Sequence, residues 1–258
     1  GPDGMLYAGV GDAGEPASAQ APDSLAGKIL RLAPDGTVPL DNPVPGSPVY
    51  SRGHRNVQGL AWAEDGTMFA TEFGQHTWDE LNEIEPGGNY GWPEVEGIAG
   101  GGSGSQEDFI DPVQQWSPSE ASPSGMAARD GTLYIANLGG EALRTVRVED
   151  PGTSMSHWSG EYGRLRDVVT TPEGELWVLT NNTDGRGDPG PKDVVIDIVA
   201  SAVNVGTSFV VSSRRWRRAM FASMAVERCA AAPPGRHGPT HVGLGLVGAV
   251  VSFLGRRG

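Results

Sequence analysis

The chain has 258 residues, enough for one large β domain or two small ones, and its 39 glycines and 20 prolines favour an all-β chain with many turns. Its formal charge of −13 is unevenly divided: residues 1–200 carry 11 Lys or Arg and 31 Asp or Glu, whereas residues 201–258 carry 8 Arg and a single Glu. The acidic first part would repel phosphates, which argues against nucleic acid as a partner. A single cysteine, Cys229, excludes a disulfide within the chain.

Four short segments share one pattern, in which an acid–Gly turn is followed by a variable residue, then Leu or Met, then an aromatic. They read PDGMLYA from Pro2, EDGTMFA from Glu64, RDGTLYI from Arg129 and PEGELWV from Pro172. The last three follow a short apolar segment, so each predicts a hairpin of strand, turn and strand. Repeated hairpins favour a β-propeller over a β-sandwich with similar turns.

The first copy has no strand before its turn, so we expect the chain to begin inside a blade, truncated at its N-terminus. No basic start followed by an apolar core marks a signal peptide at residue 1, so either the protein is cytosolic or its true N-terminus lies upstream.

Two later segments break the strand pattern. Residues 93–123 are rich in Gly and Ser and predict a long surface excursion. Alternation stops after about residue 200, and we expect the basic residues 201–258 to be a non-native or disordered tail. Residues 241–255 are apolar but shorter than the roughly 20 residues of a membrane span. A basic membrane anchor is the weaker alternative for this tail.

A dense polar stretch precedes the apolar strand that ends at Trp62. It contains His54, Arg55, Asn56 and Gln58. Loops at one end of a propeller channel bind ligands, and an Arg beside an Asn suits a ligand with carboxylates. A surface loop of turn-capping polar residues is the alternative.

Two further arginines, Arg164 and Arg166, lie two residues apart and would share one face of a strand. An anionic ligand between them would relieve their repulsion; a solvated strand end beside Asp167 is the alternative. The first strand is followed by Asp12, which could orient a catalytic base or cap a turn.

Acidic residues gather between Thr71 and Glu94, around two glycine turns. They are Glu72, Asp79, Glu80, Glu83 and Glu85. Oxygen ligands in an irregular loop suit Ca²⁺, and a solvated acidic loop explains them equally well. Isolated loop histidines are more often structural than catalytic, so neither His54 nor His76 is predicted to be a general base.

Several stretches between residue 1 and about residue 198 resemble a known family. The most specific in combination are GHRNVQG from Gly53 and GNYGWP from Gly88, and a further matching stretch is GRLRDVVTTPEGELWVLTNNTDGRGD from Gly163. In these motifs the chain resembles the soluble aldose sugar dehydrogenases that depend on pyrroloquinoline quinone (PQQ), the family that includes soluble quinoprotein glucose dehydrogenase.

The resemblance implies a six-bladed β-propeller of four-stranded blades, of which residues 1–200 would form an incomplete propeller of roughly four blades. It implies PQQ and Ca²⁺ in the central channel. PQQ carries three carboxylates, and the matching cofactor-binding positions are Arg55, Asn56, Gln58, Arg164 and Arg166. The carbonyls of Gly74 and Gln75 match a cofactor-site calcium, although the family often has proline at position 75. Glu80, by its carboxylate, and Tyr90, by its carbonyl, match a second, structural calcium.

The resemblance also implies oxidation of an aldose at C1 to the lactone, with an electron acceptor as second partner and a periplasmic or secreted location. Asp12 matches an acid beside the catalytic histidine. That histidine would lie on the strand before the Gly4 turn, so we expect this chain to bind the cofactor weakly, if at all, and to lack dehydrogenase activity. Position 139 holds Gly where the family often has a cofactor-binding lysine. A non-catalytic binding propeller and a metal-dependent hydrolase such as a lactonase remain the alternatives.

Overall fold

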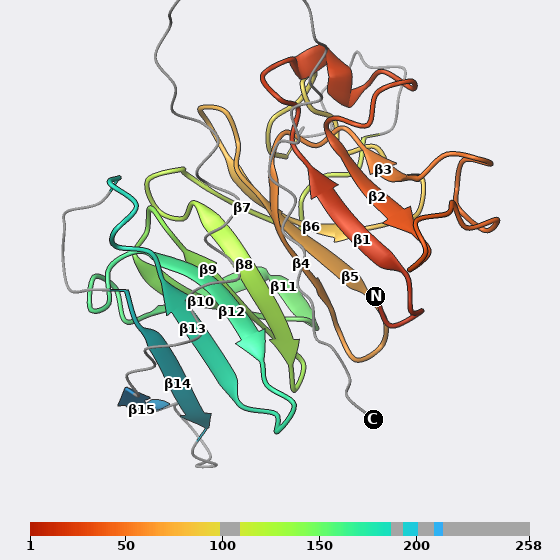
Figure 1. The fold of residues 1–258 in the computed structure, drawn as a ribbon. Coiled ribbons are helices and arrows are strands. Elements are labelled where there is room, and N and C mark those ends of the chain that lie inside the picture. The colour runs from red at the N-terminus through yellow and green to blue at the C-terminus, as the bar shows by residue number, and fades with distance from the viewer. Residues whose placement is uncertain (99–108, 187–192, 201–208, 214–258) are drawn as a thin grey trace, which may run out of the picture.

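The computed structural model describes residues 1–98, 109–186, 193–200 and 209–213. They form four antiparallel sheets that follow one another in chain order, with one short 3-10 helix, η1 (Pro16–Ala19). Figure 1 shows the sheets side by side, from the red N-terminal sheet to the blue-green fourth. The prediction of an all-β chain is therefore confirmed.

Each sheet is a meander in which consecutive strands are hydrogen-bonded neighbours. The first contains β1 (Leu6–Val10), β2 (Lys28–Leu32) and β3 (Val49–Arg52). The second contains β4 (Val57–Trp62), β5 (Met68–Glu72), β6 (Asp79–Ile84) and β7 (Gln114–Trp116). The third contains β8 (Pro123–Arg129), β9 (Thr132–Asn137), β10 (Ala142–Arg147) and β11 (Asp150–His157). The fourth contains β12 (Leu165–Thr170), β13 (Leu176–Thr180), β14 (Val195–Ala200) and β15 (Phe209–Ser213).

The three predicted hairpins are confirmed as β4–β5, β8–β9 and β12–β13. The tightest joins β8 to β9, where Arg129 pairs directly with Thr132. Its two central residues, Asp130 and Gly131, have φ of 49° and 68°. A two-residue turn needs this left-handed backbone at both positions, and Asp and Gly are among the residues that adopt it most readily.

Hydrophobic cores lie between successive sheets. The core between the first two sheets includes Ile29, Val57 and Met68. The core between the second and third includes Phe69, Leu81 and Ile135, and the core between the third and fourth includes Leu143, Val168 and Ile196. Each sheet after the first therefore packs its apolar face on the one before it.

The first strands of the sheets lie against one another, β1 on β4, β4 on β8 and β8 on β12. Glycines permit this close approach. A Cβ at Gly59 of β4 would lie 2.5 Å from the carbonyl oxygen of Ser124, and a Cβ at Gly125 of β8 would overlap Asp167 Oδ1. We call these first strands, β1, β4, β8 and β12, the inner strands. Because no side chain separates β4 from β8 at Gly59, or β8 from β12 at Gly125, polar residues of the second, third and fourth sheets can meet there.

The expectation of a surface excursion over residues 93–123 is wrong for part of that segment. Gln114–Trp116 form β7, which pairs with β6, and Trp116 is buried in the core. Main-chain hydrogen bonds to β6 stabilise this three-residue strand. Its own sequence is too short to predict a strand.

The expected tail also differs in part, because Phe209–Ser213 form β15 on β14. Its sequence FVVSS contains the aromatic and β-branched residues that favour strands. Residues 201–208 and 214–258, including Cys229 and the apolar stretch 241–255, lie outside the described residues. Within the described residues, no helix is long and apolar enough to cross a membrane.

Candidate functional site

Three inner strands place polar side chains together through irregular pairing near their starts. The pairing register shifts at Gln58 in β4, around Ser124 in β8 and at Arg166 in β12. Such irregularities change the direction of a side chain relative to a regular strand. Arg166 Nη1 lies 3.5 Å from Gln58 Oε1 and 3.4 Å from Ser124 Oγ. Gln58 Nε2 in turn donates to Asn56 Oδ1 at 2.9 Å.

Arg166 has only neutral hydrogen-bond partners in this cluster. Both of its contacts are long for hydrogen bonds, and no carboxylate of the described residues lies within ion-pair distance of its guanidinium. A half-buried guanidinium of this kind remains available to an anionic ligand.

Arg164 differs from Arg166, because it already has a carboxylate partner. Its Nη2 lies 3.2 Å from Asp184 Oδ2, and its Nη1 lies 3.4 Å from the Leu138 carbonyl oxygen. Its Nε is buried without a hydrogen-bond partner among the described residues. Arg164 therefore keeps one unused donor, and its charge is compensated by Asp184. The alternative of a solvated strand end had named Asp167 as the neighbouring acid.

Arg55 precedes β4 and contacts the loop after β5. Its Nε donates to Gln75 Oε1 at 2.6 Å, and its Nη1 donates to the Phe73 carbonyl oxygen at 3.1 Å. The guanidinium also lies 6.0 Å from the centre of the Trp92 ring. Arg55 and Arg166 therefore contact different residues, and no hydrogen-bond partner among the described residues is shared between them.

Asp12 is held by the same tryptophan. Its Oδ2 accepts a hydrogen bond from Trp92 Nε1 at 2.9 Å, and its Oδ1 accepts the Gly14 N–H at 3.0 Å. Its own N–H donates to the Arg55 carbonyl oxygen at 2.9 Å. Asp12 therefore caps a turn, one of its two predicted roles; its catalytic role stays a prediction.

The predicted metal ligands lie in two places. Gly74 and Gln75 belong to the loop between β5 and β6, whereas Glu80 and Tyr90 are buried. Glu80 Oε1 accepts the Gly97 N–H at 2.7 Å, and burial together with the nearby Glu72 charge raises the pKa of Glu80 to about 8. Within the described ranges, no group of three or more His, Cys, Asp or Glu is arranged to hold a metal.

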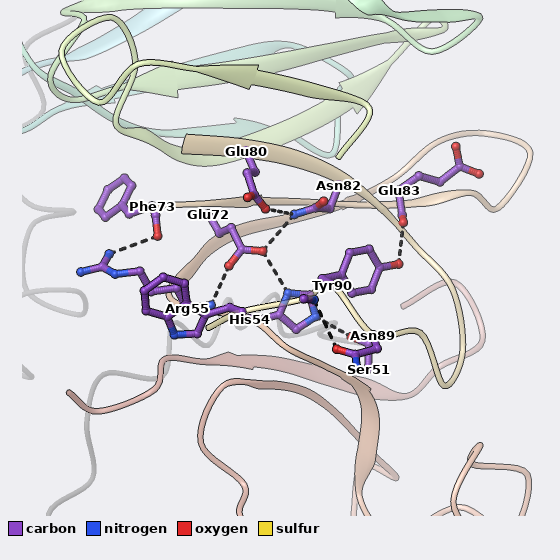
Figure 2. Close-up of polar contacts among 12 residues, drawn as sticks. Ser51, His54, Arg55, Glu72, Phe73, Glu80, Asn82, Glu83, Asn89 and Tyr90 are labelled. Carbon is purple, nitrogen blue, oxygen red and sulfur yellow. Dashed lines mark hydrogen bonds and ion pairs between the residues drawn. The ribbon is translucent and has the colours of Figure 1, made fainter. Parts of the chain in front are cut away.

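A buried network beside these residues was not predicted (Figure 2). His54 Nε2 lies 2.8 Å from Ser51 Oγ, and its Nδ1 lies 3.0 Å from Glu72 Oε1. The ring stacks on Tyr90 with 4.7 Å between centroids. Glu72 also accepts from Asn82 Nδ2 at 2.9 Å.

Serine, histidine and glutamate in this order resemble a hydrolytic triad. However, Ser51, His54 and Glu72 are each at most 3% exposed, so no substrate can reach the serine. The network therefore has a structural role, which agrees with the interpretation of His54 as a structural residue. The alternative of a solvated acidic loop is wrong for Glu72, Asp79 and Glu80, which are buried on strands, whereas Glu83 and Glu85 are exposed.

The residues present fit the cofactors that the resemblance implies. The uncompensated Arg166 and the unused Nε of Arg164 offer donors to an anion. Carboxylate and main-chain oxygens are ligands that Ca²⁺ prefers. At position 139 a Cβ would lie 2.6 Å from Ser122 Oγ, so a side chain there would require a local shift.

Comparisons with known proteins identify the family of this chain. The profile of the Glucose / Sorbosone dehydrogenase family matches residues 1–192, and the chain belongs to that family. The PQQ-bound structure of Aldose Sugar Dehydrogenase (Adh) from Streptomyces coelicolor is 54% identical, with a TM-score of 0.70, and the match covers 76% of this chain and 59% of that one.

Two curated relatives match over most of this chain. Aldose sugar dehydrogenase YliI of Escherichia coli (strain K12) is 32% identical over 213 residues, which are 71% of this chain and 56% of that protein. The uncharacterized protein slr1608 of Synechocystis sp. is 35% identical over 219 residues, which are 72% and 52% of the two chains. The chain thus spans about half the length of the curated relatives it matches.

Proposed function

We propose that this chain is the cofactor-binding part of a sugar dehydrogenase that uses PQQ and Ca²⁺ to oxidise an aldose at C1 to the lactone. The observation that carries the proposal is the environment of Arg166. Its guanidinium lies on an inner strand with only neutral partners, Gln58 and Ser124. An anionic ligand would supply the missing countercharge. The PQQ-bound relative from Streptomyces coelicolor favours PQQ as that ligand.

We further propose that residues 1–200 form four consecutive blades of a six-bladed propeller, with the ligand beside the inner strands. The contacts of β1 with β4, β4 with β8 and β8 with β12 support this arrangement. Residues 201–258 are proposed to be a segment apart from the propeller, except for β15. A periplasmic or secreted location is proposed from the family alone.

Bound PQQ would supply the two-electron acceptor for the sugar. Arg166 and the Gln58 amide would both donate charge-assisted hydrogen bonds to its carboxylates, and Asn56 would orient the Gln58 amide. Arg164 would donate through Nε, since Asp184 occupies its Nη2. Asp12, fixed by the Trp92 indole, would orient the histidine that accepts the sugar hydroxyl proton.

Calcium would bind the Gly74 and Gln75 carbonyls beside Arg55, and a second calcium would bind Glu80 and the Tyr90 carbonyl. The second proposal is supported by two buried carboxylates, Glu72 and Glu80, which share the Asn82 amide. Neighbouring buried carboxylates repel each other, and a cation beside them lowers that cost.

The direct test is titration of PQQ into the purified chain in the presence of CaCl₂, followed by tryptophan fluorescence. Trp92, one of the seven tryptophans, has its ring centre 6.0 Å from the Arg55 guanidinium and contributes a signal from this site. We expect saturable quenching at one PQQ per chain, weaker when EDTA replaces calcium. Quenching that rises linearly without saturation, as with free tryptophan, would contradict the proposal. Citrate, another tricarboxylate, controls for general attraction of anions.

A further inference from the structure

The loop between β5 and β6 donates its main-chain N–H groups to two carboxylates. The Gly74 N–H donates to Asp79 Oδ1 at 3.0 Å. The next four N–H groups all donate to Glu96 Oε1, from Gln75 at 2.7 Å, His76 at 2.9 Å, Thr77 at 2.9 Å and Trp78 at 3.2 Å. A single oxygen, Oε1 of Glu96, thus accepts hydrogen bonds from four successive main-chain N–H groups about 20 residues away in sequence.

Glu96 suits this role because a carboxylate oxygen accepts several hydrogen bonds at once, and its Oε1 lies within 2.7 to 3.2 Å of all four amide nitrogens. Hydrogen bonds to a charged acceptor are about twice as strong as neutral ones. The loop conformation is therefore fixed by Glu96 and does not depend on its own sequence alone.

The direction of the amides determines the direction of the carbonyls. Among the described residues the only cis peptide is Trp92–Pro93, so the peptides of this loop are trans. In a trans peptide the N–H of one residue and the C=O of the residue before it point in opposite directions. The Gly74 and Gln75 carbonyls share peptides with the Gln75 and His76 N–H groups, and they consequently point away from Glu96.

One carbonyl of the loop provides an independent check. Phe73 C=O shares a peptide with the Gly74 N–H, which points to Asp79. Its oxygen accepts from Arg55 Nη1 (Figure 2), so this carbonyl and the Gly74 N–H have different partners, as a trans peptide requires. The loop also closes too tightly for a side chain at position 74, where a Cβ would overlap the Trp78 carbonyl oxygen.

We propose that Glu96 is a positioning residue for the calcium site formed by the Gly74 and Gln75 carbonyls, an inference that rests on the function proposed above. Glu96 does not touch the ion. It holds the loop in the binding conformation before the ion arrives, so the ion does not have to order the loop. Groups that orient metal ligands in this way typically change metal affinity about 10- to 100-fold when they are removed.

The test is calorimetric titration of Ca²⁺ into four forms of the full chain. Each carries Glu80→Gln, which removes the second proposed site. The parent carries Glu80→Gln alone. It is compared with chains that carry in addition Glu96→Ala, Glu96→Gln or the matched control Glu94→Ala. Glu94 lies in the same segment but is exposed. Hydrogen exchange of the amides of residues 75–78 and the melting temperature in EDTA are measured on the same samples.

We expect Glu96→Ala to weaken Ca²⁺ binding about 10- to 100-fold and to speed exchange at residues 75–78. Glu96→Gln, which keeps one oxygen acceptor, should give an intermediate affinity, and Glu94→Ala should match the parent. A merely structural role would lower the melting temperature in EDTA and leave the affinity unchanged.

Affinity of both Glu96 variants within twofold of the parent would overturn the inference while the calcium proposal stands. A parent that binds no Ca²⁺ would overturn both. If Glu96→Ala fails to unfold cooperatively in EDTA, the decision falls to Glu96→Gln, whose affinity must then be lower than that of the parent.

Discussion

Glu72 Oε1 lies 3.0 Å from Nδ1 of His54, and the other oxygen of the same carboxylate accepts the Arg55 N–H at 2.9 Å. One buried side chain at the end of β5 thus holds both the His54 ring and the main chain from which Arg55 extends. Since Arg55 is a predicted cofactor contact, the stability of this network and the geometry of the site depend on the same residue.

Replacing Glu72 by alanine should strongly destabilise the chain. Three donors, His54 Nδ1, Arg55 N and Asn82 Nδ2, would lose their acceptor in a buried place. A buried donor left without its acceptor costs about 1 to 3 kcal/mol. Urea unfolding followed by circular dichroism measures this loss.

The matched control is Glu83→Ala on the adjacent strand β6. The Glu83 side chain is exposed, and only its main-chain oxygen contacts Tyr90. Its free energy of unfolding should change by no more than about 0.5 kcal/mol. Equal effects of the two substitutions would mean that the Glu72 network does not stabilise the fold.

Gly59→Ala tests the close contact of the inner strands. The added Cβ would lie 2.5 Å from the Ser124 carbonyl oxygen and 2.8 Å from Thr71 Oγ1, so β4 and β8 must separate. Such overpacking costs about 1 to 3 kcal/mol. Gly152→Ala is the control, because no atom lies within 4 Å of its added Cβ. A Gly59→Ala chain as stable as the Gly152→Ala chain would contradict the packing of β4 on β8.

Asp167 gives the chain a pH dependence of known sign. Burial raises the pKa of Asp167 above its ordinary value of 3.8, while the Val168 N–H and the Arg166 charge lower it less. Above pH 3.8 and up to that raised pKa, the folded state binds more protons than the unfolded state. The free energy of unfolding therefore falls as pH rises through this interval.

The measurement is urea unfolding at pH 4 and pH 7 in EDTA. The parent should lose more stability between these pH values than Asp167→Asn, which has no carboxyl proton to lose. Asp130→Asn, at an exposed position, should behave as the parent. An identical change in the parent and in Asp167→Asn would refute the assignment.

The sequence predicts the three hairpins because their determinants are local. An acid–Gly turn and its two flanking strands lie within a few residues of one another, and the turn sets the register. The strands β7 and β15 escape prediction for the opposite reason. They complete their sheets on β6 and β14, and their sequences alone are too short to show it.

For the site, motif positions indicate Arg55, Gln58 and Arg166 individually, but not that Gln58 and Arg166 meet. Their contact joins residues 108 positions apart and depends on register shifts at the strand starts. Glu96 was not singled out, and Glu72 was named only as a possible calcium ligand, because an acidic residue in a loop-like stretch has no periodic signal of burial. Their partners are main-chain groups and a histidine distant in sequence, which only the fold brings close.

The measurement that tests the account most directly is PQQ binding by Arg166→Gln beside Arg147→Gln. Arg166 lacks a carboxylate partner among the described residues, whereas Arg147 is exposed and paired with Glu149. Loss of a charged hydrogen bond of about 1.5 to 3 kcal/mol corresponds to a Kd raised about 10- to 150-fold. The account predicts that increase for Arg166→Gln and an unchanged Kd for Arg147→Gln. Equal Kd values for Arg166→Gln and the parent chain would contradict it.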